Sequence, residues 1–161
     1  MEERMLIEFN KRINKLEKIN ITIDSKLIPT KKIRGIYGFF AKKETKEYCF
    51  YIGKSNNIFI RLLGSNSHLN NYLRGVRSTD VHKNIEQYLF DGYSINVKVL
   101  EIVEYKGNCF EQDANILALA ELKQLVYYQD QNQCKNQLSE AVKVKREKAE
   151  WDSLFVKNNR Q

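Results

Sequence analysis

Apolar residues near both ends of the chain recur every three or four positions, a spacing typical of helices with one apolar face. The first such segment predicts a helix over residues 3–19, with basic side chains on its other face. The last predicts a helix in which Trp151, Leu154 and Phe155 follow a basic run over residues 143–148. The first helix either covers the core or forms an arm that contacts a partner. Its apolar positions are Leu6, Phe9, Ile13 and Leu16.

The middle of the chain contains two short segments rich in β-branched and aromatic residues. Residues 33–40 and 48–53 predict strands, and the charged stretch 41–47 predicts the loop that joins them in an antiparallel hairpin. Alternation over residues 93–103 predicts a third strand. A shorter candidate strand, Ile21–Ile23, lies in the connector after the first helix.

Alternation also decides which side chains of the hairpin share a face. It places Ile36 and Ile52 on one face of the sheet, and Tyr37 and Tyr51 together on the other. Tyrosines on one sheet face usually pack with a satisfied hydroxyl. The tyrosine pair alone therefore does not indicate chemistry.

Three further segments predict helices. Residues 55–57 offer caps for a helix that opens at Ile58. Residues 80–90 and 111–128 predict two longer helices, whereas the polar stretch 64–79 predicts a loop. The apolar stripe predicted for the longest helix consists of Leu119, Leu122, Leu125 and Val126.

Together these elements predict an α+β fold in which a small three-stranded antiparallel sheet is flanked by helices. A length of 161 residues is typical of one domain. We expect a core over residues 33–137, with a helical extension over residues 1–32 and a basic helical extension over residues 138–161. Both extensions are expected to pack onto or beside the core.

Basic residues outnumber acidic ones by 27 to 20, and the formal net charge of +7 favours a polyanionic partner such as nucleic acid. Residues 1–34 hold nine basic and five acidic side chains. Residues 35–136 are nearly balanced, with twelve basic and eleven acidic side chains. The electrostatic contribution to binding is therefore expected largely from the two ends.

Other function classes fit the composition poorly. No apolar run approaches the roughly 20 residues that a membrane span needs, and the first four residues lack the layout of a secretory signal. We therefore expect a cytoplasmic protein with no membrane partner. The three cysteines form no CxxC pair, so we expect reduced thiols and no structural zinc site.

Two charged residues stand where the apolar pattern predicts burial. Arg61 is the one polar side chain in residues 58–63, and a buried guanidinium needs a partner. That partner is either a carboxylate such as Glu121 or a phosphate, which the planar guanidinium fits well. Glu121 lies between Leu117 and Leu125 at the edge of the apolar stripe. A single carboxylate suits Mg²⁺, which takes few protein ligands.

Gly35-Ile36-Tyr37 and Tyr51-Ile52-Gly53 resemble the two signatures of the GIY-YIG nuclease superfamily. The stretch from Lys54 to Leu62 is similar to the family's cap and helix with a fixed arginine, here Arg61. The resemblance covers residues 33–137 and leaves both end segments outside it.

Three more positions follow the family's order. Glu121 lies in the long helix where the family keeps its metal-binding glutamate, and Asn136 lies fifteen residues further on, where many members have an asparagine. His82 heads a helix where some members place a histidine. A histidine at a helix start is as often structural or exposed, and Asn136 fits a turn equally well. His68, in the predicted loop, is a weaker candidate.

The resemblance implies a metal-dependent endonuclease that hydrolyses phosphodiesters of double-stranded DNA by one-step attack of water. It implies Mg²⁺ as cofactor, with Mn²⁺ as a substitute, and no small-molecule cofactor. Glu121 would hold the metal, and Arg61 would stabilise the non-bridging oxygens. Tyr37, helped by Tyr51, would deprotonate or orient the water, and His82 would relay the proton.

Lys54 and Asn136 would support this chemistry. A tyrosine base needs a nearby positive charge because its ordinary pKa is about 10, and Lys54, Arg61 or the metal would supply it. A short chain with basic ends resembles the type II restriction branch and favours a homodimer that cuts both strands. The alternatives are a phage or mobile-element nuclease of the same family, and a non-catalytic nucleic-acid-binding module on the same scaffold.

Overall fold

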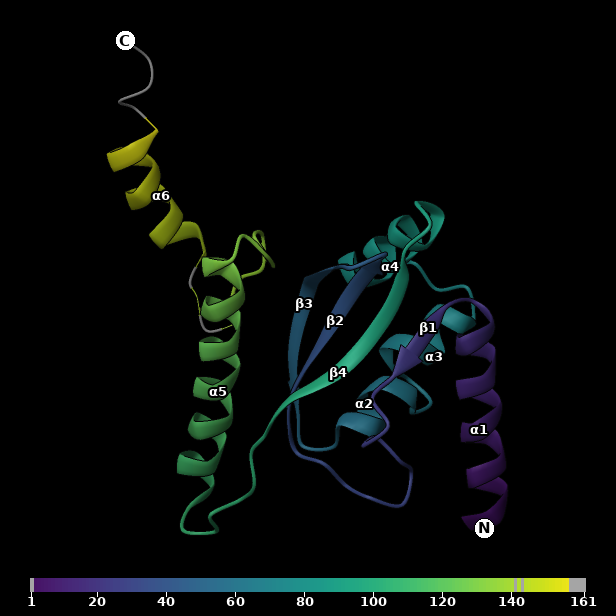
Figure 1. Ribbon diagram of the computed structural model, residues 1–161. Coiled ribbons are helices and arrows are strands. Elements are labelled where there is room, and N and C mark those ends of the chain that lie inside the picture. Colours follow the sequence, from purple (N-terminus) through teal and green to yellow (C-terminus); the bar gives the residue numbers. More distant parts are fainter. Residues whose placement is uncertain (1, 141, 143, 157–161) are drawn as a thin grey trace.

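The strands form one mixed sheet in the order β1-β4-β2-β3 (Figure 1). The computed structural model describes residues 2–140, 142 and 144–156. Strand β2 pairs antiparallel with both β3 and β4, whereas β1 pairs parallel with β4. The strands are β1 (Ile21–Ile23), β2 (Gly35–Lys43), β3 (Lys46–Ser55) and β4 (Ser94–Ile102).

The α+β class, the hairpin and the third long strand are confirmed, but the predicted three-stranded antiparallel sheet is wrong. β1 adds a fourth, parallel strand along the edge of β4 that β2 leaves open. That edge presents backbone groups that need partners. Ile95 N–H donates to the Asn20 carbonyl, and Asp24 N–H donates to the Val97 carbonyl. A three-residue strand is too short for its pattern to predict which strand it joins.

Helices cover both faces of the sheet (Figure 1). α1 to α4 lie on one face, α5 lies on the other, and α6 points away from the sheet. No helix in the described part of the chain is both long enough and apolar enough to cross a membrane. The helices are α1 (Glu2–Lys18), α2 (Ile58–Leu63), α3 (His68–Leu73), α4 (Asp80–Phe90), α5 (Phe110–Asp130) and α6 (Val144–Phe155).

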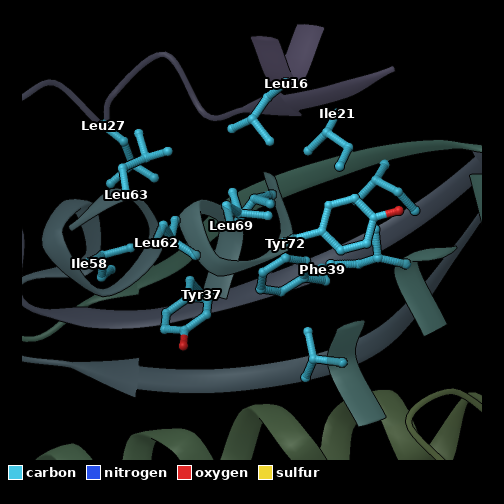
Figure 2. Close-up of a cluster of buried hydrophobic side chains, with 14 of the residues drawn as sticks. Leu16, Ile21, Leu27, Tyr37, Phe39, Ile58, Leu62, Leu63, Leu69 and Tyr72 are labelled. Atoms are coloured by element: carbon cyan, nitrogen blue, oxygen red, sulfur yellow. The ribbon is translucent and has the colours of Figure 1, made fainter. Parts of the chain in front are cut away.

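Alternation along the hairpin divides the apolar side chains between two cores. Tyr37 is buried on the side of α1 to α4 (Figure 2). Tyr51 is partly buried and packs against the same cluster. Ile36 and Ile52 are buried on the side of α5. The predicted division of these four residues between the two faces is confirmed.

The N-terminal segment is part of the main core. Phe9 and Leu16 on α1, Ile21 on β1 and Leu27 after it are all buried in the cluster that also holds Tyr37. The ring of Phe9 meets that of Phe59 edge-on, with centroids 4.8 Å apart. Of the two alternatives for the first helix, covering the core is the one that the structure shows.

The segment predicted as a loop over residues 64–79 contains helix α3. Ser67 caps this helix by accepting a hydrogen bond from the Asn70 N–H. Only Leu69, Asn70 and Tyr72 are buried along it, so its mixed polar sequence lacks a clear helical period. The hairpin loop is also shorter than predicted, because the strands run on to Lys43 and from Lys46.

The predicted apolar stripe of α5 is mostly wrong. Leu125 is buried, whereas Leu119, Leu122 and Val126 are 42–50% exposed. The face toward the sheet instead contains Leu117, Ala120, Glu121 and Leu125. Apolar residues occupy more than one face of this helix, and periodicity alone could not tell which face meets the sheet.

Helix α4 forms over the predicted residues 80–90, and Thr79 caps it by accepting from the His82 N–H. The predicted C-terminal helix is present as α6, which buries none of its residues. Trp151, Leu154 and Phe155 on it are each more than half exposed. Within the predicted extension over residues 138–161, residues 141, 143 and 157–161 lie outside the described residues.

The segment after α5 covers the outer edge of β3. The side chain of Gln137 accepts from the Ile52 N–H at 2.9 Å and donates to the Ile52 carbonyl at 2.6 Å. Gln133 Oε1 accepts from the Cys49 N–H, and the Cys134 N–H donates to the Cys49 carbonyl. These amides therefore pair β3 as a further strand would, since an edge strand otherwise presents unpaired backbone groups.

We expect Gln137→Ala to lower the free energy of unfolding by about 2–4 kcal/mol, because it leaves both backbone groups of buried Ile52 without a partner. Asn136→Ala is the matched control, since Asn136 is exposed and should cost less than about 0.5 kcal/mol. Urea unfolding of the two variants measures the difference. Equal costs would show that the Gln137 amide does not hold the edge of β3.

Candidate active site around strand β3

The site begins with a close approach between the two strands of the hairpin. Tyr37 on β2 pairs in register with Gly53 on β3. A Cβ atom at Gly53 would lie 2.5 Å from Cζ of Tyr37 and 2.6 Å from its hydroxyl oxygen. Figure 2 shows the Tyr37 hydroxyl pointing away from the labelled apolar side chains. Gly53 therefore makes room for the Tyr37 ring to lie across β3.

A buried arginine fixes the strand that carries Tyr37, and the sequence did not single it out. Arg34 donates to the Val103 carbonyl, to the Asp113 carbonyl and to Asn56 Oδ1. Its guanidinium also stacks on Tyr105, 4.1 Å from the ring centroid. These contacts join the start of β2 to the end of β4 and the first turn of α5. Arg34 is therefore a structural arginine, held by three hydrogen bonds and by stacking on Tyr105.

Arg61 lies beside the tyrosines, and the prediction that it is buried is wrong. It is exposed on α2, as is its neighbour Ile60, because a six-residue helix packed by one face leaves the other in solvent. The ring centroids of Tyr37 and Tyr51 are 6.3 Å apart. The charge of Arg61 acts on both phenols in the direction that lowers their pKa values. These three side chains come from three different elements and meet at one place.

Burial nevertheless keeps both tyrosines protonated. It raises the pKa of Tyr37 above its ordinary value, and the neighbouring Tyr51 raises it further. The pKa of Tyr51 is raised for the same first reason, against the opposing effect of Arg61. One guanidinium does not offset desolvation, so the phenols are hydrogen-bond donors at neutral pH.

His68 joins this group, although the sequence gave it little weight. Its ring centroid lies 5.7 Å from that of Tyr51. Burial, followed by the charge of Arg61, lowers the pKa of His68 to about 4, so its ring is neutral at pH 7. Its Nε2 atom is buried and has no hydrogen-bond partner among the described residues. Only the cap at Ser67 could have revealed the helix that places His68 here.

His82 contacts the backbone of His68. It is 2% exposed, and its Nε2 lies 2.9 Å from the carbonyl oxygen of His68. Because a carbonyl only accepts, Nε2 carries a proton, and Nδ1 is buried without a hydrogen-bond partner in the part of the chain that the structure describes. The two rings lie 6.3 Å apart. His82 is therefore placed to position the start of α3.

Glu121 and Lys54 form a second group on the opposite face of β3. Lys54 Nζ lies 3.5 Å from Glu121 Oε1, and 3.6 Å from Oε2 of exposed Glu140. Glu121 is buried between Leu117 and Leu125, whereas its spacing predicted a position at the edge of the buried stripe. Burial raises its pKa, and Lys54 opposes this shift. The ion pair of Glu121 is thus with Lys54 and not with Arg61.

The two groups influence each other around β3. The negative charges of Glu121 and Glu140 both act to raise the pKa of Tyr51. Asn136 is exposed in the turn after α5, and no hydrogen bond of its side chain occurs within the described part of the chain. The sequence analysis selected Asn136 as a supporting residue, whereas the adjacent Gln137 is the one that contacts β3.

Glu121 is the candidate metal ligand, and its surroundings fit a hard cation. The described residues contain no group of three or more histidine, cysteine, aspartate or glutamate side chains that could hold a metal ion. A single carboxylate whose charge is incompletely compensated suits Mg²⁺, which keeps several waters in its shell.

Comparisons of the chain with protein-family models, with curated proteins and with solved structures find no match.

The contact between Gly53 and Tyr37 can be tested by a double-mutant cycle. We expect Gly53→Ala to lower the free energy of unfolding by about 1–3 kcal/mol, since the added methyl meets the Tyr37 ring. In a Tyr37→Leu background the same change should cost much less, because the clashing ring atoms are gone. Chemical denaturation measures all four proteins. The same cost in both backgrounds would contradict the contact.

Proposed function

We propose that the protein is a metal-dependent endonuclease that hydrolyses phosphodiester bonds in double-stranded DNA. The observation that carries the proposal is the meeting of Tyr37, Tyr51 and Arg61, with Glu121 and Lys54 across the same strand. These are the residues that carry the resemblance to the GIY-YIG nucleases in the sequence. Their proximity supports one site rather than scattered coincidences.

Arg61 is the phosphate-binding group in this proposal. Its exposure leaves the guanidinium accessible, and the planar fork matches two oxygens of a phosphodiester. Glu121 forms its ion pair with Lys54, so its carboxylate does not neutralise the Arg61 guanidinium. As the phosphorus becomes pentacoordinate, charge grows on the non-bridging oxygens, and a cation already in place stabilises that charge.

In this proposal Tyr37 and His68 have different roles toward the attacking water. The Tyr37 hydroxyl keeps its proton and orients the attacking water by donating to it, unless added positive charge lowers its pKa. His68 is neutral and has a free ring nitrogen beside Tyr51, so it is a second candidate to accept the proton. His82 holds the backbone of His68 and acts as a positioning residue.

Glu121 would hold Mg²⁺, with Mn²⁺ as a substitute, in this reading. When bound, the ion would supply charge stabilisation at the leaving oxygen. Lys54 lies close to the same carboxylate and opposes the rise in its pKa, which favours the ionised form that would hold the metal.

The biological setting is also part of the proposal. A small nuclease of the type II restriction kind in the cytoplasm, acting as a homodimer, accounts for cutting both strands with one site per chain. A phage or mobile-element nuclease would use the same residues. A non-catalytic nucleic-acid-binding module is the competing function, and the experiments below separate it from an enzyme.

Replacing Tyr37 with Phe removes only the hydroxyl. We expect cleavage of plasmid DNA in Mg²⁺ to fall by roughly 10²-fold or more, because the water loses its orienting group. Tyr88→Phe is the matched control, since Tyr88 packs against Phe50 in the same core with centroids 4.9 Å apart and should cut normally. Near-normal cleavage by Tyr37→Phe would transfer the role to Tyr51 or His68.

Glu121→Gln tests the whole proposal, because it keeps the shape of the side chain and removes the charge that holds the metal. We expect cleavage to be almost abolished, while DNA affinity without metal stays equal to that of the parent or rises slightly. The melting temperature should change little, because Lys54, which loses its ionic partner, is itself partly exposed to solvent. A variant that still cuts DNA would overturn the metal-site assignment, and a parent that binds but never cuts would favour the binding module.

A further inference from the structure

Helix α1 is fixed against the helices that carry the candidate site. Phe9 and Leu16 are buried on its inner face. On the adjoining face, Arg12 donates to the carbonyl of Leu63 at the end of α2 and also pairs with Glu8. The side chains on the outer face of α1 are therefore held in a defined place relative to α2 and α3.

A groove of about 400 Å³ lies between α1 and α3. Lys11, Arg12 and Lys15 line it from α1, and Arg74 lines it from the end of α3. Glu8 is the one acidic side chain among its lining residues. Four cations thus face one carboxylate across a concave surface.

Three of these cations are unneutralised. Arg12 forms the ion pair with Glu8. Lys11, Lys15 and Arg74 are exposed, and within residues 2–140, 142 and 144–156 none of them forms a salt bridge. Like charges brought together on two separate elements repel one another until an anion lies between them.

The groove lies close to Arg61 along the chain. Ser65, which lines the groove, follows Arg61 by four residues, so their Cα atoms are at most about 15 Å apart. That distance corresponds to roughly four nucleotides of axial rise in one DNA strand. Lys11 and Lys15 stand one helical turn apart, about 6 Å along α1, which spans about two phosphates of axial rise.

We propose that the groove between α1 and α3 binds the phosphodiester backbone of duplex DNA beside the phosphate that meets Arg61. Lys11, Lys15 and Arg74 each contact a backbone phosphate and read no base. The inference rests on the proposed nuclease function for its choice of DNA. It assigns the positive N-terminal segment a second role besides filling the core.

Point substitutions are needed to test the groove, because truncating α1 would remove Phe9 and Leu16 from the core. The test protein is the full chain with Lys11→Gln, Lys15→Gln and Arg74→Gln. The matched control carries Lys46→Gln, Lys83→Gln and Lys106→Gln, three exposed lysines on β3, α4 and the loop before α5. Each triple variant loses three positive charges, so the two proteins have the same net charge.

Binding to a short duplex is measured without divalent cations over about 50–200 mM salt. Each lost phosphate contact removes about 0.9 from the slope of log K against log salt. The groove variant should therefore lose about 2–3 from the slope and bind at least about tenfold more weakly, with an unchanged melting temperature. The control should keep the slope of the parent.

Equal weakening of the two variants would overturn the groove and leave only a net-charge effect. An unchanged groove variant would overturn it as well. Cleavage of the same duplex in Mg²⁺ is scored separately. If the parent cuts DNA and the groove variant binds DNA normally, the groove proposal is contradicted and the nuclease proposal stands. If the parent binds DNA through the groove but never cuts it, the nuclease proposal is contradicted and the groove proposal stands.

Discussion

The position of the edge strand β3 is the constraint on which the candidate site depends. This strand carries Tyr51, Gly53 and Lys54, yet it has a sheet neighbour on one side only. Its outer backbone is instead paired by the amides of Gln133 and Gln137. Without that cover, the strand would be free to bend or to pair with another chain. The stability of the site therefore originates in a loop that contains none of the proposed catalytic groups.

The geometry of β3 also explains how one site draws on both faces of a sheet. Alternation sends Tyr51 toward the α1–α4 side and Lys54 toward α5, where it meets Glu121. In the proposed function, groups from the two faces of β3 would act on one substrate. The charge of Glu121 reaches Tyr51 across the strand.

Local pattern predicted the elements well, and long-range pairing poorly. The hairpin, α4, α5 and the faces of the two tyrosines followed from periodicity, which is a property of neighbouring residues. β1 was found as a strand, but its parallel pairing with β4 joins residues 74 positions apart. Sequence pattern carries no information on such a partner.

The candidate site shows the same division. Tyr37, Tyr51, Glu121 and Lys54 were singled out by motif and spacing; Tyr37 lies beside Tyr51 and Lys54 beside Glu121, in two groups on opposite faces of β3. The predicted burial of Arg61 was wrong because its five apolar neighbours do not show which side of a six-residue helix meets solvent. Among the described arginines, Arg34 is the buried one, and its three acceptors come from distant segments. Such contacts are visible only in the folded chain.

The parallel pairing of β1 with β4 has a consequence for the order of assembly. During synthesis, α1 and β1 leave the ribosome long before Ile95 and Val97, the residues that β1 pairs with, have been made. Contacts so distant in sequence are costly to close and form late. Until then Ile21 has no sheet to join, and the basic face of α1 has no α3 opposite it. The groove between α1 and α3 therefore takes shape only after both strands of the β2–β3 hairpin have been made.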